Sequence, residues 1–104
     1  MFYHAVLMKL SNTDPTTLAR IAHYESRILA ELAYVRDYRF GRNVASRSDG
    51  FDWAVVATFD SSADHERYQV SDVHQEMKAF MAQYITDLVV CDIDSRKGRD
   101  NHDR

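Results

Sequence analysis

The order in which apolar segments follow one another constrains the fold of this chain more than any single residue does. Residues 2–10 form a short, nearly continuous apolar run, which predicts a strand covered on both faces. Asp14 and Pro15 then have the residue types of a helix cap and a first helical position. Apolar residues follow at helical spacing and predict an amphipathic helix: Leu18, Ile21, Ala22, Ile28, Leu29 and Leu32.

The rest of the chain predicts a hairpin, two helical pieces and a last strand. Residues 34–44 predict a strand broken at Gly41, and residues 51–59, rich in Trp, Val, Thr and Phe, predict the strongest strand. Residues 45–50 are polar and join the two. Ser61 or Ser62 can cap a short helix through Val70, and Asp72 with Gln75 resembles a capping box for a longer helix through roughly residue 87. Residues 88–94 predict the final strand.

This order predicts an α+β fold of the ferredoxin-like type, with a four-stranded antiparallel sheet and helices on one face. We expect one domain over residues 1–94 and a charged, disordered tail over residues 95–104, which carry almost nothing to bury. Two helices can cover only one face of such a sheet. The opposite face is expected to pack against a second copy of the chain, giving a homodimer, and to include Tyr3, Ala5, Leu7, Ala54 and Val56.

Charge and cysteine content exclude several classes of partner. The net charge is −3, and because residues 95–104 hold four basic and two acidic groups, residues 1–94 carry −5. Nucleic acid is therefore not an expected partner. No apolar run approaches the ~20 residues of a membrane span, so no membrane partner is expected either. Cys91, the single cysteine, is expected to be a small buried hydrophobe, and a cytoplasmic location fits its unpaired thiol.

Four side chains are candidates for chemistry. Glu25 projects within the apolar stripe of the first helix, so it is either a rim residue whose carboxylate reaches water or a pocket residue with a partner. His74 heads the apolar stripe of the last helix, where the helix N-terminus favours a neutral imidazole. The alternative is a core histidine that donates to a carbonyl. His4 shares a strand face with Val6 and Met8, and the same structural alternative applies to it. Tyr68 precedes His74 across a predicted helix break.

No metal site and no cofactor is predicted. His4, Glu25 and His74 offer two imidazoles and one carboxylate, but neither a His-x-x-x-His nor a Cys-x-x-Cys spacing supports them as ligands. His23, His65 and His102 lie on a polar helix face, near a helix start and in the tail, and are assigned no role. With three glycines in the chain, no glycine-rich phosphate loop is present.

Five segments, taken in order, resemble the stress-responsive A/B barrel (Dabb) family. They are residues 4–9 (HAVLMK), residues 40–43 (FGRN), residues 51–59 (FDWAVVATF), Tyr68 followed by Val73-His74, and residues 89–92 (VVCD). The similarity runs from residue 2 to about residue 94. It implies a homodimeric α/β barrel with a pocket in each subunit, between the helices and the sheet.

The resemblance also suggests roles for individual residues. The catalytic histidine and tyrosine of a cofactor-free polyketide cyclase of the family fall on His74 and Tyr68, and a pocket histidine falls on His4. Two other pocket positions of that cyclase differ here, where they are Glu25 and Trp53, so the same substrate is not expected. The expected pocket is lined by His4, Val6, Met8, Ile21, Glu25, Trp53, Val55, Tyr68, His74, Met77, Met81, Ile85 and Leu88.

Three functions remain open at this stage. One is a cofactor-free lyase, cyclase or isomerase that acts on a small organic molecule, with His74 as general base, Tyr68 polarising a carbonyl and Glu25 orienting a polar group. The second is a noncatalytic stress-response or ligand-binding homodimer. The third is a cofactor-free monooxygenase of a similar dimeric barrel type. Fold alone does not decide among them.

Overall fold

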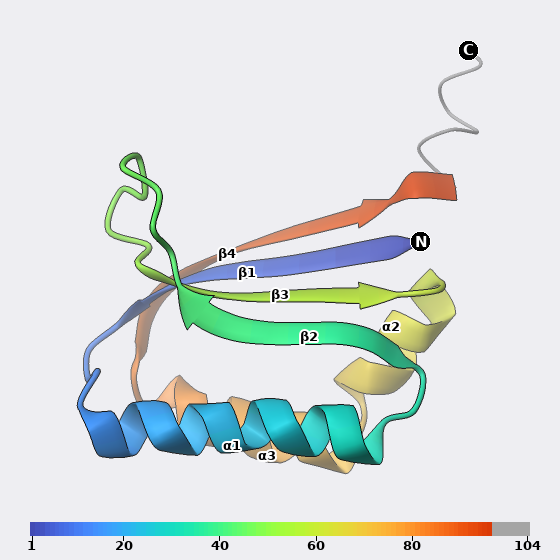
Figure 1. The fold of residues 1–104 in the computed structure, drawn as a ribbon, viewed down its shortest axis with the longest axis horizontal. Helices are drawn as coiled ribbons and strands as arrows, with labels where there is room; N and C mark the ends of the chain where they lie inside the picture. Colours follow the sequence, from blue (N-terminus) through green and yellow to red (C-terminus); the bar gives the residue numbers. More distant parts are fainter. Residues whose placement is uncertain (97–104) are drawn as a thin grey trace.

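The sheet of the computed structural model, which describes residues 1–96, has the strand order β2-β3-β1-β4. The strands are β1 (Phe2–Leu10), β2 (Val35–Arg42), β3 (Trp53–Phe59) and β4 (Ile85–Asp94), and every neighbouring pair is antiparallel. The helices are α1 (Pro15–Glu31), α2 (Ser62–Gln69) and α3 (Asp72–Ala82). They lie on one side of the sheet (Figure 1). The predicted ferredoxin-like α+β fold is confirmed.

Helix α1 begins and packs as its sequence dictates, although its buried stripe differs from the predicted one. The Asp14 carboxylate accepts a hydrogen bond from Thr17 N at 2.8 Å and caps the helix, and Pro15 occupies the first turn. The buried residues are Thr17, Ile21, Tyr24 and Ile28, whereas Ala22 and Leu29 are exposed. The prediction was wrong for these two because it gave no weight to Tyr24, which is buried and packs against Phe80 of α3 with ring centroids 5.9 Å apart.

Helix α3 and strand β4 divide their residues differently from the prediction. Ser71, and not Asp72, caps α3, because Ser71 Oγ accepts from His74 N at 3.3 Å. The helix ends at Ala82, five residues before the predicted end. Ile85 pairs with Leu10 of β1 instead of continuing the helix, so β4 starts there. The apolar spacing typical of a helix continues through Ile85, but this residue forms strand pairing with β1 instead.

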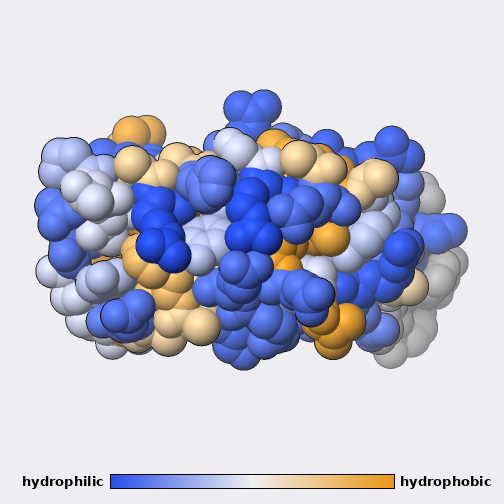
Figure 2. All heavy atoms as spheres, turned by 90° about the horizontal axis from the view of Figure 1, so that it is seen from below, coloured by the Kyte–Doolittle hydropathy of each residue, from blue (hydrophilic) through white to orange (hydrophobic). Residues whose placement is uncertain are grey.

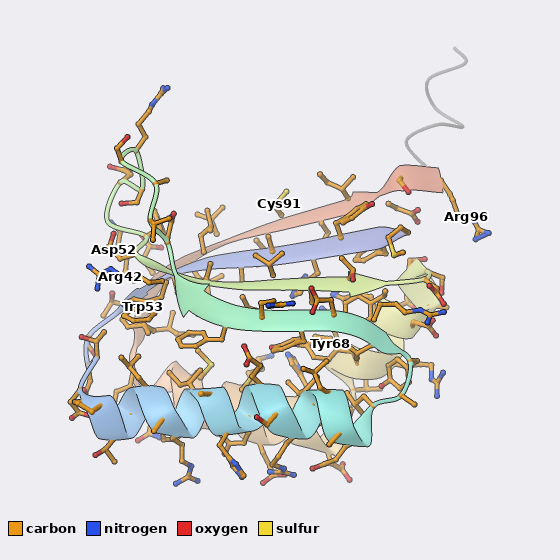
Figure 3. All side chains as sticks on the ribbon, viewed as in Figure 1. Arg42, Asp52, Trp53, Tyr68, Cys91 and Arg96 are labelled. Atoms are coloured by element: carbon orange, nitrogen blue, oxygen red, sulfur yellow. The ribbon has the colours of Figure 1, made fainter. Side chains whose placement is uncertain are left out.

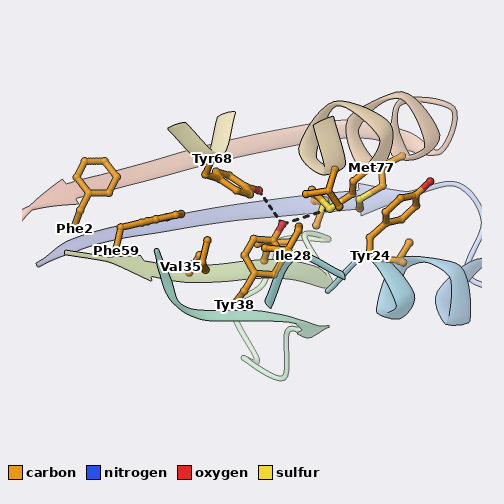
Figure 4. Packing of buried hydrophobic residues seen from close by; sticks show 14 residues of the cluster. Phe2, Tyr24, Ile28, Val35, Tyr38, Phe59, Tyr68 and Met77 are labelled. Atoms are coloured by element: carbon orange, nitrogen blue, oxygen red, sulfur yellow. Dashed lines mark hydrogen bonds between the residues drawn. The ribbon is translucent and has the colours of Figure 1, made fainter. Parts of the chain in front are cut away.

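The core lies between the helices and the inner face of the sheet (Figure 4). Along β1, Phe2, His4 and Met8 are buried, while Tyr3 between them is exposed. The helix side of the molecule shows mainly hydrophilic side chains to solvent (Figure 2), as expected for the outer faces of amphipathic helices.

The outer face of the sheet is apolar and is not covered by any part of residues 1–96. Ala5 pairs with Val56 on one side and Cys91 on the other, and Tyr3 lies beside Ile93. Tyr3, Val56, Val89 and Ile93 are each about half exposed, between 45% and 54%. The thiol of Cys91 also points away from the helices (Figure 3), so the expectation that it is buried is wrong for the single chain.

The predicted tail falls mostly outside the described residues, which end at Arg96. Ser95, its first residue, donates from its backbone N to Met1 O at 3.1 Å and from its Oγ to the same oxygen at 2.9 Å. This residue is therefore tied to the start of β1. No helix within residues 1–96 is long and apolar enough to cross a membrane.

Candidate functional site

A cavity of about 450 Å³ lies between the inner face of the sheet and helices α2 and α3. Ten of the predicted pocket residues line it: His4, Val6, Met8, Val55, Tyr68, His74, Met77, Met81, Ile85 and Leu88. Most of this lining is apolar, and the polar groups come from few residues. That composition is typical of small-molecule sites, in which a few polar groups fix the orientation of a largely apolar ligand.

Three residues of the predicted pocket lie elsewhere. Ile21 is fully buried in the core. Glu25 accepts a hydrogen bond from the backbone N of Phe40 at 2.5 Å, so its carboxylate ties α1 to the edge strand β2. Trp53 stacks on Phe40 with ring centroids 5.5 Å apart. These three positions do not belong to the cavity lining.

Five cavity residues were not predicted from the sequence: Tyr38, Gln69, Lys78, Ala82 and Val90. Val90 and Leu88 project inward from β4 because residues two apart share a strand face. That face could be identified only with the correct start of β4. Tyr38 carried a usable signal, since it is the buried aromatic residue at the centre of the predicted second strand.

The break between α2 and α3 brings Tyr68 and His74 together. Ser71 Oγ donates to Tyr68 O at 2.7 Å, at the end of α2, and also accepts from His74 N in the first turn of α3. The rings of Tyr68 and His74 lie 4.4 Å apart, measured between centroids, and are tilted by 56°. Both residues line the cavity.

His74 is held in one tautomer. Its Nδ1 lies 3.0 Å from the carbonyl oxygen of Gln69, and because a carbonyl can only accept, Nδ1 carries the hydrogen. Nε2 is then left with a lone pair. Burial lowers the pKa of His74; the bond to Gln69 opposes this shift, and the charges of Lys78 and His4 add to it. The imidazole is therefore neutral near pH 7 and can accept a proton through Nε2.

Tyr68 is a hydrogen-bond donor and not an anion at neutral pH. Burial raises its pKa to about 12, against a smaller opposing effect of its hydrogen bond with Tyr38. The two hydroxyl oxygens are 2.9 Å apart, and Tyr38 also reaches Met77 Sδ at 3.4 Å (Figure 4). Because Met77 Sδ can only accept, Tyr68 donates to Tyr38 whenever Tyr38 donates to Met77; when Tyr38 donates to Tyr68 instead, the proton of Tyr68 is free for a ligand in the cavity.

At the other end of the cavity, His4 has partners that sequence analysis missed. Its Nδ1 lies 2.5 Å from Asp92 Oδ1, because the β1–β4 register places the two residues side by side. The ring of His65, to which no role was assigned, lies 4.6 Å from that of His4. His65 is 5% exposed and stacks on Phe2. Burial, followed by the nearby His4, lowers the pKa of His65.

Comparison with known sequences identifies the family of this chain. The sequence profile of the stress responsive A/B barrel domain matches residues 2–95, which is nearly the whole chain. The chain belongs to this family. No curated protein sequence matches it.

Solved structures share the fold of this A/B barrel domain at low sequence identity. A dimeric ferredoxin-like protein of unknown function from Thermobifida fusca is 22% identical, with a TM-score of 0.75 and 88% of each chain covered. The hydroxynitrile lyase of Passiflora edulis is 20% identical, with a TM-score of 0.77, and the match covers 90% of this chain and 94% of the lyase. A candidate antibiotic biosynthesis monooxygenase from Caulobacter crescentus is 11% identical, with a TM-score of 0.76 and coverage of 90% and 88%.

Proposed function

We propose that this A/B barrel domain is a cofactor-free lyase, cyclase or isomerase that acts on a small carbonyl compound in the cavity. The observation that carries this proposal is the pairing of Tyr68 and His74, with ring centroids 4.4 Å apart, on the wall of a mainly apolar cavity. One group can accept a proton and the other can donate a hydrogen bond. The fold shared with a hydroxynitrile lyase supports the lyase class.

The proposed reaction needs only these two side chains. His74 Nε2 takes a proton from the carbon beside a substrate carbonyl, while Tyr68 donates a hydrogen bond to the carbonyl oxygen as it becomes an enolate. The enolate carbon then attacks a second carbonyl, as in a cyclase, or regains a proton at another position, as in an isomerase. The reverse of the first path breaks a carbon–carbon bond. His74 returns its proton to the product in each case.

The mouth of the cavity suggests which ligands are accepted. Lys78 lies at the rim and is exposed, so it can meet an anionic group of a ligand whose apolar part fills the interior. We therefore propose small carbonyl compounds that carry a carboxylate or another anion as the substrate class.

Solvent exchange provides a direct test. A panel of aromatic ketones and β-keto acids in D₂O is followed by NMR for exchange of the protons beside the carbonyl. The wild type is expected to accelerate exchange, and Tyr84→Phe is a matched control because Tyr84 packs against Phe80 outside the cavity. A panel that binds, as seen by ligand line broadening, without any acceleration would contradict the catalytic proposal.

The second proposal is that this domain is a homodimer joined through the outer sheet face. The half-exposed Tyr3, Val56, Val89 and Ile93 form an apolar surface that a second copy would cover. The solved protein from Thermobifida fusca is described as dimeric. Sedimentation velocity at micromolar concentration should show a dimer, and Val56→Asp should shift it to monomer. Ala30→Asp, on the exposed face of α1, is the control that should leave the dimer intact.

A noncatalytic ligand-binding role is the main alternative, and one contact favours it. The Tyr68 hydroxyl already has a partner in Tyr38, as a purely structural tyrosine would. The monooxygenase alternative has the support of the shared fold with the Caulobacter protein. Oxygen consumption with electron-rich aromatic compounds, in place of proton exchange with ketones, would favour the monooxygenase.

A further inference from the structure

Three side chains with metal-binding atoms meet beside the cavity, and one of them, His4, lines it. They come from β1 (His4), α2 (His65) and β4 (Asp92), and one nitrogen or oxygen atom of each lies within 4.8 Å of the others. The β1–β4 register places Asp92 beside His4. Residues far apart in the sequence are therefore brought together by the sheet and by the packing of α2 on it.

The histidine from α2 has a buried ring nitrogen without a hydrogen-bond partner in the described residues. His65 is 5% exposed, and within residues 1–96 its Nε2 is the one buried side-chain nitrogen or oxygen atom without a hydrogen-bond partner. An unsatisfied buried polar atom is destabilising, and in a native structure it calls for an explanation such as a bound ion. The ring is also fixed, since it stacks on Phe2 at 4.6 Å and meets the edge of Phe59 at 5.3 Å.

We propose that His4, His65 and Asp92 bind one divalent transition-metal ion, with zinc as the reference case. Two imidazoles and one carboxylate are a donor set that zinc and its neighbours in the first transition row accept, with further positions left to water or to a ligand. Neither His74 nor Tyr68 belongs to the site, but the ring of Tyr68 lies 6.1 Å from the rings of both His4 and His65, between centroids. His4 also lines the cavity, so an open position of the ion would adjoin the ligand.

The distances fit such an ion after small adjustments. Ligand atoms about 2.0 Å from a tetrahedral zinc ion lie about 3.3 Å from one another. That value falls between the 2.5 Å of the His4–Asp92 contact and the 4.8 Å limit of the whole cluster. Side-chain shifts of about 1–1.5 Å would therefore suffice. The side chain of Asp92, 36% exposed, leaves a route from solvent.

Calorimetric titration of the untagged full-length protein with ZnCl₂, and a parallel titration with CoCl₂ read by visible absorption, test the site. The wild type should bind one ion per chain, and bound cobalt should show the absorption of a low-coordinate site. Loss of a direct ligand should weaken binding by at least about 100-fold, beyond the 10–100-fold effect typical of second-shell partners. This loss is expected for His65→Phe, which retains an aromatic ring against Phe2, and for Asp92→Asn.

Matched controls separate this site from nonspecific histidine binding. His23→Gln removes an exposed histidine of α1 that is not part of the cluster and should leave the affinity unchanged. Circular dichroism reports whether His65→Phe is folded, and Asp92→Asn, at the partly exposed strand β4, provides a second reading if it is not. The proposal is overturned by a wild type that binds neither ion, or by binding that persists in both cluster variants. Binding lost in His23→Gln would overturn it as well.

Discussion

His65 is buried and His74 half-buried between the helices and the sheet, and the two differ in what each ring meets. In both, burial is the largest cause of a lowered pKa, so both are neutral near pH 7. His74 donates through Nδ1 to Gln69 O, whereas the Nε2 of His65 has no hydrogen-bond partner within residues 1–96. Burial thus sets the charge of a histidine, but its partners decide which nitrogen remains available and for what chemistry.

The largest expected effect separates the two histidines by activity. His74→Gln should lower the rate of proton exchange by about 10²–10⁴-fold, the usual contribution of a general base, because no other group replaces Nε2. His65→Phe should lower it far less, since His65 lies outside the cavity lining. NMR exchange rates in D₂O measure both. Equal losses in the two variants would break the division of roles.

The next effect concerns the hydrogen-bond donor beside His74. Tyr68→Phe should reduce the exchange rate by about 10²-fold, comparable to the loss of one donor to a developing oxyanion. Tyr38→Phe should act more weakly, because Tyr38 only orients the Tyr68 hydroxyl. The KM should change little in either case if the donor acts in the transition state. A Tyr38 variant slower than the Tyr68 variant would transfer the donor role to Tyr38.

A smaller effect is expected in the pH dependence of stability. Both histidines have folded-state pKa values below the ordinary 6.5, so the unfolded chain binds protons first as the pH falls. Their contribution to the free energy of unfolding is complete above about pH 6.5 and decreases as the pH falls toward the folded-state values. Thermal melts between pH 8 and pH 5 should show this decrease. The slope should be shallower in His65→Phe, whereas His23→Gln should match the wild type.

The smallest effect is an expected lack of change. Glu25 is held by Phe40 N at the edge of β2, and it is not among the charges that shift the pKa of His74. Glu25→Gln should therefore leave the NMR titration of His74 unaltered. A clear fall of the His74 pKa in this variant would show that the carboxylate reaches the imidazole. Gln69 O would then not be the only polar group of the described residues that acts on the imidazole as an acceptor.

The element order could be predicted from the sequence because each element has a local cause. The cap at Asp14, the alternation in the strands and the helix break near Ser71 all depend on neighbouring residues. The meeting of His4, His65 and Asp92 could not be predicted, because it depends on the β1–β4 register. That register depends on α3 ending at Ala82. Glu25 was correctly placed on the inward side of α1, but the group that it meets belongs to a strand edge.

The serine between α2 and α3 has a consequence for how functional residues are recognised in such domains. In one continuous helix, residues six apart are related by a net rotation of about 240° around the helix axis, so their side chains project from different sides of the helix. Ser71 ends one helix and starts the next, and this interruption lets residues 68 and 74 face the same cavity. Ser71 itself does not line that cavity. The spacing between the proposed acid and base thus depends on a residue that does not line the cavity, and a substitution at Ser71 could separate the two side chains while leaving both intact.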